Sequence, residues 1–372
     1  MKFKLARTLL VCIILAMSSC TSSETKTDNY DLPIDSYDLS LGLDTLKIDI
    51  SNSLGSYSKY SVQGESLYGF NILRSAYEYI DLENKKSGNA INSKQFFEFS
   101  NVPISEIIAI DNSRIAVLDR LNKVYIINED SIEFYIDLKK YINSDRTIQN
   151  FSYGYSFSYH DSTVYYTSTN NSLESIDENT INLHKFSLKD SSISTYQLPI
   201  LEGMDVNDFR WNYLYLTNSL DNKLIIHFRN YKDIILFDFL SEAVNIVNLD
   251  LNLEDIFKYL KPEMKEIEKM VSGGYLYQLI PDSKRSVYYL FSVNPQELLN
   301  ANGKRNSPIR RDFEINILDK SFTLLSKNNV SGELKNKITP FANFYSNGTL
   351  FFEIESSEED TLRFIEYSFK ND

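Results

Sequence analysis

Short runs of apolar residues, separated by clusters of polar residues, dominate the chain after residue 40. Many of these runs alternate apolar and polar positions, and they are rich in β-branched and aromatic residues, a composition typical of β-strands. Examples are RIAVLD (114–119), KVYIIN (123–128), KLIIHF (223–228) and TLFFEIE (349–355). The pattern therefore predicts an all-β protein.

Six segments of the chain resemble one another, which indicates an internal repeat. Each is an alternating strand that ends in an apolar residue and is followed by two to four Asp, Glu, Asn, Lys or Ser residues. In the first five segments a further strand follows. If the last apolar residues are equivalent, successive repeats lie 45, 61, 51, 79 and 51 residues apart, at Leu82, Ile127, Leu188, Phe239, Leu318 and Phe369.

A second hairpin with a polar turn lies upstream of each repeat. The order strand, polar turn, strand, loop, strand, polar turn, strand is that of one β-propeller blade, so six copies predict six blades. Two separate β-sandwiches are the alternative architecture. The six upstream turns are 63–66, 111–114, 160–163, 219–222, 282–285 and 346–349.

The two ends of the chain predict how the ring closes. The last repeat stops at Asp372 after its third strand, which leaves that blade one strand short. An alternating segment near the other end, 43–50 (LDTLKIDI), has no blade of its own. If this segment joins the last blade, no sheet edge is left bare between the first and last blades.

Two insertions interrupt the repeat, and both fall on blade five. Residues 252–270 carry apolar side chains at helical spacing, with Asn252 as a possible cap, and predict a small helical insertion before that blade. Residues 294–311 lengthen the loop between the middle strands of the blade and carry most of the local basic charge. Loops on one sector of a rigid scaffold are where binding functions tend to lie. The amphipathic helix could equally cover an apolar edge.

The N-terminus has the pattern of a secretory signal peptide. Residues 1–20 (MKFKLARTLLVCIILAMSSC) carry basic residues, then an apolar run, then small residues before a cysteine. The apolar run is far shorter than the roughly 20 residues that a membrane-spanning helix needs. The stretch 15–20 (LAMSSC) resembles the lipobox of bacterial lipoproteins, in which the cysteine is lipidated. We therefore expect Cys20 to carry acyl chains such as palmitate, with a free or disulfide-bonded Cys20 as the alternative.

This interpretation sets the expected domain organisation. Residues 1–19 are a signal peptide, residues 20–40 are a lipidated cysteine and flexible tether, and residues 41–372 are a single propeller. Cys12 would be removed with the signal peptide, so the mature chain would have one cysteine and no internal disulfide. Acyl chains on Cys20 would make the membrane a partner of the protein. The expected location is the bacterial cell envelope, at the periplasmic or surface face of the outer membrane.

Charge excludes one class of partner. The chain has 51 acidic and 38 basic residues, a net charge of −13, whereas a protein that binds nucleic acid needs an excess of Lys and Arg on one face. Removal of residues 1–19 takes away three positive charges and no negative ones, which lowers the net charge from −13 to −16. Such a surface is not attracted to anionic lipid headgroups.

Compact catalytic motifs are absent from the sequence. It contains no Gly-rich phosphate loop, G-x-S-x-G elbow, H-E-x-x-H pair or C-x-x-C motif, and we predict neither a cofactor nor a metal site. The three histidines, His160, His184 and His227, have no metal-ligand spacing, and we expect them to be half-buried or exposed strand residues. A propeller can still gather residues from separate blades into one central site, so catalysis remains open.

Candidate binding residues are the polar side chains just before or within the innermost strands, which line the centre of a propeller. The run 205–208 could offer oxygen ligands to calcium, although a loop turn is the favoured interpretation. The tyrosines could stack on a carbohydrate, although most would pack between blades. The candidates are Asp205, Asn207, Asp208, Arg210, Tyr275, Tyr277, Asn343 and Tyr345.

The lipobox at Cys20, the length near 370 residues and the six repeats together resemble a family of Bacteroidota lipoproteins known as domain of unknown function four-two-two-one. The resemblance covers nearly the whole chain. It implies an extracytoplasmic, propeller-like lipoprotein and supplies no catalytic residues.

Three functions are compatible with these features. The leading hypothesis is a non-enzymatic binding or sensing module for a peptide, glycan or protein partner. The second is a hydrolase or lyase with a pair of carboxylates in the central channel. The third is a scaffold subunit of an envelope complex.

Overall fold

The chain divides into two compact units, Met1–Leu32 and Pro33–Asp372. All residues described below belong to the second unit. The computed structural model describes residues 37, 39–50, 57–63, 66–71, 76–91, 104–111, 113–119, 121–128, 131–142, 146–148, 157–170, 181–201, 214–249, 251, 268, 271–307, 310–332, 337–354, 356, 358 and 360–369.

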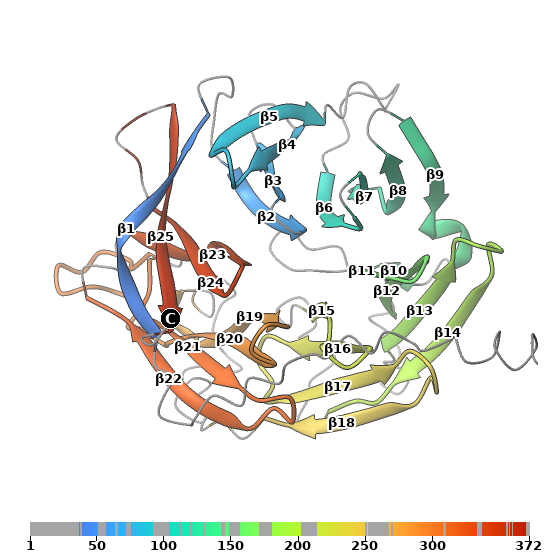
Figure 1. The fold of residues 1–372 in the computed structure, drawn as a ribbon. Coiled ribbons are helices and arrows are strands. Elements are labelled where there is room, and N and C mark those ends of the chain that lie inside the picture. The colour runs from blue at the N-terminus through green and yellow to red at the C-terminus, as the bar shows by residue number, and fades with distance from the viewer. Residues whose placement is uncertain are drawn as a thin grey trace, which may run out of the picture. The chain divides into compact units, whose positions relative to one another are not determined.

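The second unit is all-β and contains six blades in a propeller arrangement (Figure 1). Within each blade, neighbouring strands of the sequence pair antiparallel from the inner strand outwards. Blades one to three contain β2 (Tyr57–Gln63), β3 (Ser66–Asn71), β4 (Ala76–Asp81) and β5 (Lys86–Ile91); β6 (Ile104–Ala109), β7 (Arg114–Asp119), β8 (Lys123–Asn128) and β9 (Ser131–Asp137); and β10 (Arg146–Ile148), β11 (Phe157–His160), β12 (Thr163–Asn170), β13 (Ile181–Ser187) and β14 (Ile193–Leu198).

Blade three differs because its inner position is shared by β10 and β11, which both pair with β12. A 3₁₀ turn, η2 (Leu138–Tyr141), precedes that blade. Blades four to six contain β15 (Leu214–Asn218), β16 (Lys223–Phe228), β17 (Asp233–Asp238) and β18 (Val244–Asn248); β19 (Tyr275–Asp282), β20 (Val287–Val293), β21 (Phe313–Leu318) and β22 (Leu324–Val330); and β23 (Ile338–Ser346), β24 (Thr349–Ile354), β25 (Thr361–Phe369) and β1 (Leu39–Asp49).

The inner strands form a closed ring. Each contacts the next, in the order β2, β6, β11, β15, β19, β23 and back to β2. Figure 1 shows these strands around the centre of the second unit, with β5, β9, β14, β18, β22 and β1 on the outside. Six blades were predicted from the repeats, and six are present.

The closing strand is also confirmed. β1 pairs antiparallel with β25, from Leu39 opposite Phe369 to Asp49 opposite Thr361, with a register shift between Leu41 and Thr45. The strand begins at Leu39, within the segment predicted as tether, and ends one residue before the predicted Ile50. The Asp49 N–H donates to the carbonyl of Lys85 in blade one at 3.0 Å. β1 therefore completes blade six and also reaches blade one.

The repeated polar residues mark the turn between the third and outer strands of a blade. In the turns after β4, β17 and β21, an aspartate Oδ1 accepts backbone N–H groups from the residues that follow it. These bonds pair backbone N–H groups of the turn that have no partner in the neighbouring strand, which is why aspartate recurs there. The sixth similar segment is β25, whose outer neighbour is β1. The capping residues are Asp81, Asp238 and Asp319.

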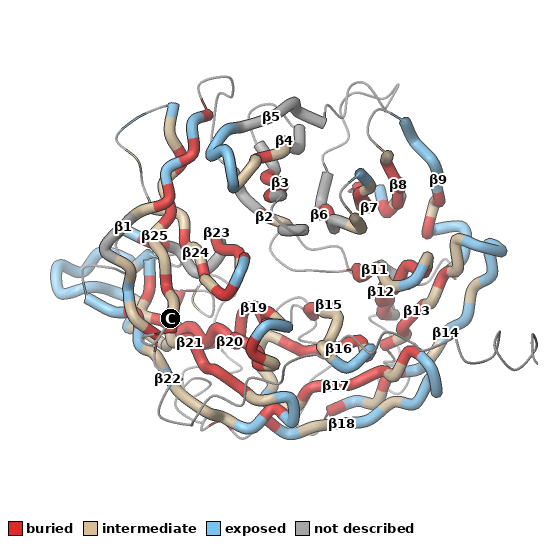
Figure 2. Tube along the Cα trace, viewed as in Figure 1, coloured by how far each residue is buried: buried red, intermediate tan, exposed pale blue. Residues whose placement is uncertain are grey.

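Among the described residues, six apolar clusters form the core, one between each pair of neighbouring blades. Figure 2 shows that buried residues recur along the inner and middle strands. A single strand contributes side chains to two of these clusters, because successive side chains point to opposite faces of the strand. In β16, Leu224, Ile226 and Phe228 pack towards blade three, whereas Ile225 packs towards blade five. Burial on both faces explains why residues 224–226 (LII) of this strand form an unbroken apolar run.

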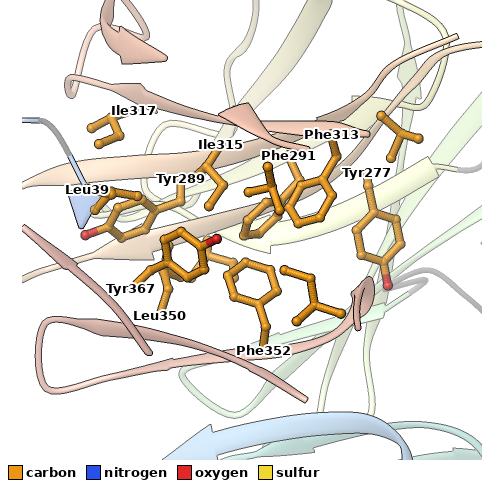
Figure 3. Close-up of a cluster of buried hydrophobic side chains, with 14 of the residues drawn as sticks. Leu39, Tyr277, Tyr289, Phe291, Phe313, Ile315, Ile317, Leu350, Phe352 and Tyr367 are labelled. Carbon is orange, nitrogen blue, oxygen red and sulfur yellow. The ribbon is translucent and has the colours of Figure 1, made fainter. Parts of the chain in front are cut away.

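The cluster between blades five and six is rich in aromatic rings. Figure 3 shows Phe291 and Phe313 of blade five against Phe352 and Tyr367 of blade six. The Phe291 and Phe352 ring centres lie 5.7 Å apart with the rings nearly perpendicular. This edge-to-face geometry is one that aromatic pairs prefer.

The helical insertion predicted for 252–270 lies outside the described residues except for Glu268. Glu268, Val271 and Ser272 are helical. No helix among the described residues is long and apolar enough to cross a membrane.

Two histidines are more buried than the sequence suggested. His184 and His227 lie in the core, and only His160 is half-buried, stacked on Phe239 with ring centres 4.1 Å apart. His184 is held between the hydroxyls of Ser168 and Thr195. The Nε2–H of His227 donates to the Tyr277 carbonyl at 2.8 Å, and burial lowers the pKa of this ring to about 4. His184 is thus held by two hydroxyls of its own sheet, and His227 by a backbone carbonyl of blade five.

Candidate functional site

The predicted site residues fall into two groups. Tyr275 and Tyr277 lie in β19, and Asn343 and Tyr345 lie in β23, both of which are inner strands. The others lie outside the described residues: Cys20, Asp205, Asn207, Asp208 and Arg210.

Tyr345 belongs to a buried polar joint between blades five and six. Its hydroxyl donates to Oδ1 of Asp282, and the Tyr289 hydroxyl donates to Oδ2 of the same carboxylate at 2.8 Å. The Arg285 guanidinium pairs with Asp282 Oδ2 at 3.1 Å and donates to the Gly348 carbonyl at 3.0 Å. Arg285 therefore connects the first turn of blade five with that of blade six.

The two tyrosines of the joint stay protonated near neutral pH. Burial raises the pKa of Tyr289 and Tyr345, and so do their hydrogen bonds to Asp282. Both hydroxyls therefore remain protonated donors to the carboxylate. Because Asp282 is fully buried and closed in by its partners, we assign this cluster to structure.

Tyr275 lies against two arginines at the other end of β19. The Arg229 Cζ atom is 3.4 Å from the centre of its ring, and the Arg311 Cζ atom is 5.4 Å away. Arg311 and Tyr275 are both buried. Burial lowers the pKa of Arg311 to about 10, so the guanidinium stays charged at neutral pH and can form a cation–π contact.

Tyr277 and Asn343 are also buried between blades. The Tyr277 ring meets the edge of the Tyr215 ring, with centres 5.8 Å apart. The four described candidates thus pack between blades and do not form a common exposed site. The sequence interpretation that most tyrosines pack between blades is confirmed for these.

A more accessible feature is the connection from β20 to β21, Asn294–Arg311, which we call the blade-five loop. Within it, Asn300 Oδ1 accepts the N–H groups of Asn302 and Lys304 at 3.0 Å each, and the Asn300 N–H donates to the Lys304 carbonyl at 2.7 Å. Gly303 has a φ of +71°, a conformation that favours glycine. The result is a tight hairpin.

Hydrogen bonds fasten this hairpin to the body of blade five. Gln296 Nε2 donates to the carbonyls of Val271 and Ser307 at 2.9 and 2.7 Å, and its N–H donates to the carbonyl of Ser272. Arg311, the last residue of the loop, packs near Tyr275 and donates to the Asn294 carbonyl. The contacts of Arg229 and Arg311 with Tyr275 therefore support the base of the loop.

Three basic side chains and an apolar one are exposed on the loop: Lys304, Arg305, Arg310 and Leu299. Leu299 is 51% exposed. A hairpin that is already ordered loses little conformational entropy when it binds. The sequence located the loop and its charge, but its internal hydrogen bonds could be seen only in the structure.

The hydrolase hypothesis requires two carboxylates close together, and the two described acids with a raised pKa do not form such a pair. Burial raises the pKa of Asp119 in blade two and of Glu353 in blade six, and each accepts a hydrogen bond from a tyrosine. In the described part of the chain, no group of three or more His, Cys, Asp and Glu side chains could hold a metal ion. The two acids with raised pKa lie on blades that are not neighbours.

Glu353 gives a pH-dependent stability prediction. It lies on β24, accepts a hydrogen bond from Tyr60 of blade one, and burial raises its pKa to about 7. This pKa exceeds the value in the unfolded chain, so the unfolded chain ionises first as the pH rises. The free energy of unfolding is therefore highest at acidic pH and falls as the pH rises towards 7. We expect Glu353→Gln to raise the free energy of unfolding by about 2 kcal/mol at pH 8 and by little at pH 5.

Urea unfolding at the two pH values measures this effect. Glu83→Gln, at an exposed turn of blade one, is the matched control and should change neither value. An equal gain at pH 5 and pH 8 would show that Glu353 is not protonated in the folded protein.

The six blades and the closing strand define the protein as a β-propeller. No family model and no curated protein matches its amino-acid sequence. Among solved structures, it is similar to a member of the DUF4221 family from Bacteroides vulgatus, with a TM-score of 0.61 and 15% identity, over 90% of this chain and 99% of that chain. This is the domain-of-unknown-function family that the lipobox and repeats resemble.

A second similar structure is a candidate exported protein from Bacteroides fragilis. The TM-score is 0.50 at 10% identity, and the likeness covers 89% of this chain and 95% of that chain. At these identities the comparisons establish a shared propeller fold.

Proposed function

We propose that the protein is a lipid-anchored binding module of the bacterial cell envelope. Its blade-five loop would recognise an acidic region of a peptide, glycan or protein partner. The observation that carries this proposal is the ordered basic hairpin, fixed to a rigid propeller by Gln296 and Arg311. Cations are otherwise outnumbered in this acidic chain, so the loop offers a local site for an acidic partner.

The envelope location is supported by the N-terminal sequence and by one structural neighbour. Residues 1–19 have the features of a signal peptide, and Cys20 ends a lipobox-like stretch. The neighbour from Bacteroides fragilis is described as a candidate exported protein. Insertion of the acyl chains would hold the propeller beside the outer membrane, and its acidic surface would add no attraction to anionic lipid.

Replacement of the lipidated residue tests this location. We expect Cys20→Ala to move the protein from the membrane pellet to the soluble fraction, because the anchor is lost while the propeller is unchanged. Cell fractionation measures the distribution, and metabolic labelling with a palmitate analogue should mark wild type alone. A variant that still pellets with membranes would contradict lipid anchoring.

A photo-crosslinking experiment tests the binding role. Leu299→benzoylphenylalanine in the anchored protein, irradiated in its own cells, should give a covalent adduct. The combined change Lys304→Glu and Arg305→Glu should lower the adduct yield roughly tenfold, because it replaces attraction with repulsion. Leu121→benzoylphenylalanine, on an exposed turn of blade two, is the matched control. Adducts at both positions, or none at 299, would contradict recognition by the loop.

A further inference from the structure

The outer strands of blades three and four differ from those of the other blades. An exposed edge strand can pair with another chain, and proteins commonly protect such edges with charged side chains. β14 and β18 are the outermost strands of their sheets, and neither contains a charged residue. The uncharged stretches extend over 191–201 and 243–249. The other four outer strands carry Lys86, Glu133, Lys327 and Lys47.

An open groove lies between these two strands. It is lined by Gln197, Leu198, Pro199, Val244, Asn245 and Ile246. Ile246 is 50% exposed, and Ile200, which follows the end of β14, is 43% exposed. Apolar side chains thus remain in contact with water where the edge also lacks charge.

An exposed leucine projects from the same blade. Leu240, in the turn between β17 and β18, is 90% exposed. Its N–H donates to Asp238 Oδ1 at 3.0 Å, and a 2.6 Å ion pair between Lys185 and Glu242 ties the turn to blade three. In the other turns between a third and an outer strand that an aspartate caps, at Asp81, Asp190 and Asp319, the residue two positions later is polar: Glu83, Ser192 and Ser321.

The turn geometry therefore does not require leucine. The aspartate Oδ1 accepts the same backbone hydrogen bond whether the donating residue is glutamate, serine or leucine. A leucine held away from its own fold, beside an apolar groove, is typical of an interaction surface. We call the surface formed by β14, β18 and Leu240 the blade three–four rim.

We propose that a second copy of this chain docks on the blade three–four rim, with Leu240 of each copy against the groove of the other. Two copies of a chain with a net charge of −13 repel each other over most of their surfaces. The strands β14 and β18 carry no charged residue, which lowers this repulsion along the two edges. One chain also supplies both the projecting leucine and the groove, which is the self-complementarity that a twofold contact needs.

The oligomeric state of the full-length protein tests the proposal. The protein is extracted in a non-ionic detergent and examined by sedimentation equilibrium from about 1 to 100 µM. We expect a concentration-dependent dimer. Leu240→Lys and Ile246→Lys should each raise the dissociation constant by at least roughly tenfold, because each places an unpaired charge in the contact.

Two exposed leucines outside the rim provide matched controls. Leu121→Lys and Leu299→Lys carry the same substitution at positions that are about half exposed, and both should leave the dimer intact. Thermal unfolding of every variant checks that the propeller is retained. A monomer throughout the concentration range, or equal dissociation by the controls, overturns the proposal.

Discussion

Asp282→Ala is expected to lower the free energy of unfolding by about 3–5 kcal/mol, the range for removing one partner of a buried ion pair. The change leaves the Arg285 guanidinium buried without its carboxylate, and it leaves two tyrosine hydroxyls without their acceptor. The joint also connects two blades, because Arg285 reaches the carbonyl of Gly348. Urea unfolding, followed by tyrosine fluorescence, measures the loss.

A related turn in blade two is the matched control. Asp111 and Arg114 have the same spacing and the same contacts, with an N–H bond of 2.9 Å and an ion pair of 2.7 Å. Their side chains are 38% and 39% exposed. We expect Asp111→Ala to cost about 1 kcal/mol or less, because water replaces an exposed partner. Equal losses for the two variants would contradict the role assigned to burial.

Gly348 provides a second test of the same joint. Its φ is +92°, and a Cβ there would lie 2.5 Å from Nη1 of Arg285. Alanine at this position would therefore strain the backbone and displace the guanidinium. This contact could not be read from the sequence, in which 282–285 and 346–349 are two polar turns among six.

The fold could be predicted because a propeller repeats the same local pattern. Each blade has alternating strands and polar turns, so errors at a single element do not alter the number of blades. The closing strand could also be placed, because β1 alternates and blade six lacks a fourth strand. Its first residues could not, since 39–42 (LSLG) follow a polar segment that resembles a tether.

The site could be predicted only in part. Tyr275 and Tyr345 were correctly placed on inner strands, but their burial depends on residues from other blades. Arg229 contacts Tyr275 from blade four, and Asp282 contacts Tyr345 from blade five. One sequence without structure does not reveal which of its polar residues meet across a blade interface. The charge of the blade-five loop was evident, whereas its rigidity depends on backbone hydrogen bonds.

Ile48→Asp is expected to destabilise the whole propeller by more than about 4 kcal/mol. Ile48 is fully buried in β1 and packs in the cluster between blades six and one, which also contains Ile80 and Phe364. A charge there must be dehydrated without a compensating partner, or β1 must leave β25. The second course would expose an edge of blade six and open the contact with blade one.

The neighbouring residue makes this a test of ring closure. Lys47 lies on the same strand, but its side chain is 55% exposed, so Lys47→Asp should change stability by less than about 1 kcal/mol. Urea unfolding gives the global effect, and hydrogen exchange of β25 reports whether β1 has separated. If only β25 loses protection in Ile48→Asp while the global stability is retained, the other blades do not depend on closure. If the whole protein unfolds at a lower urea concentration, the closing strand β1 controls the stability of every blade.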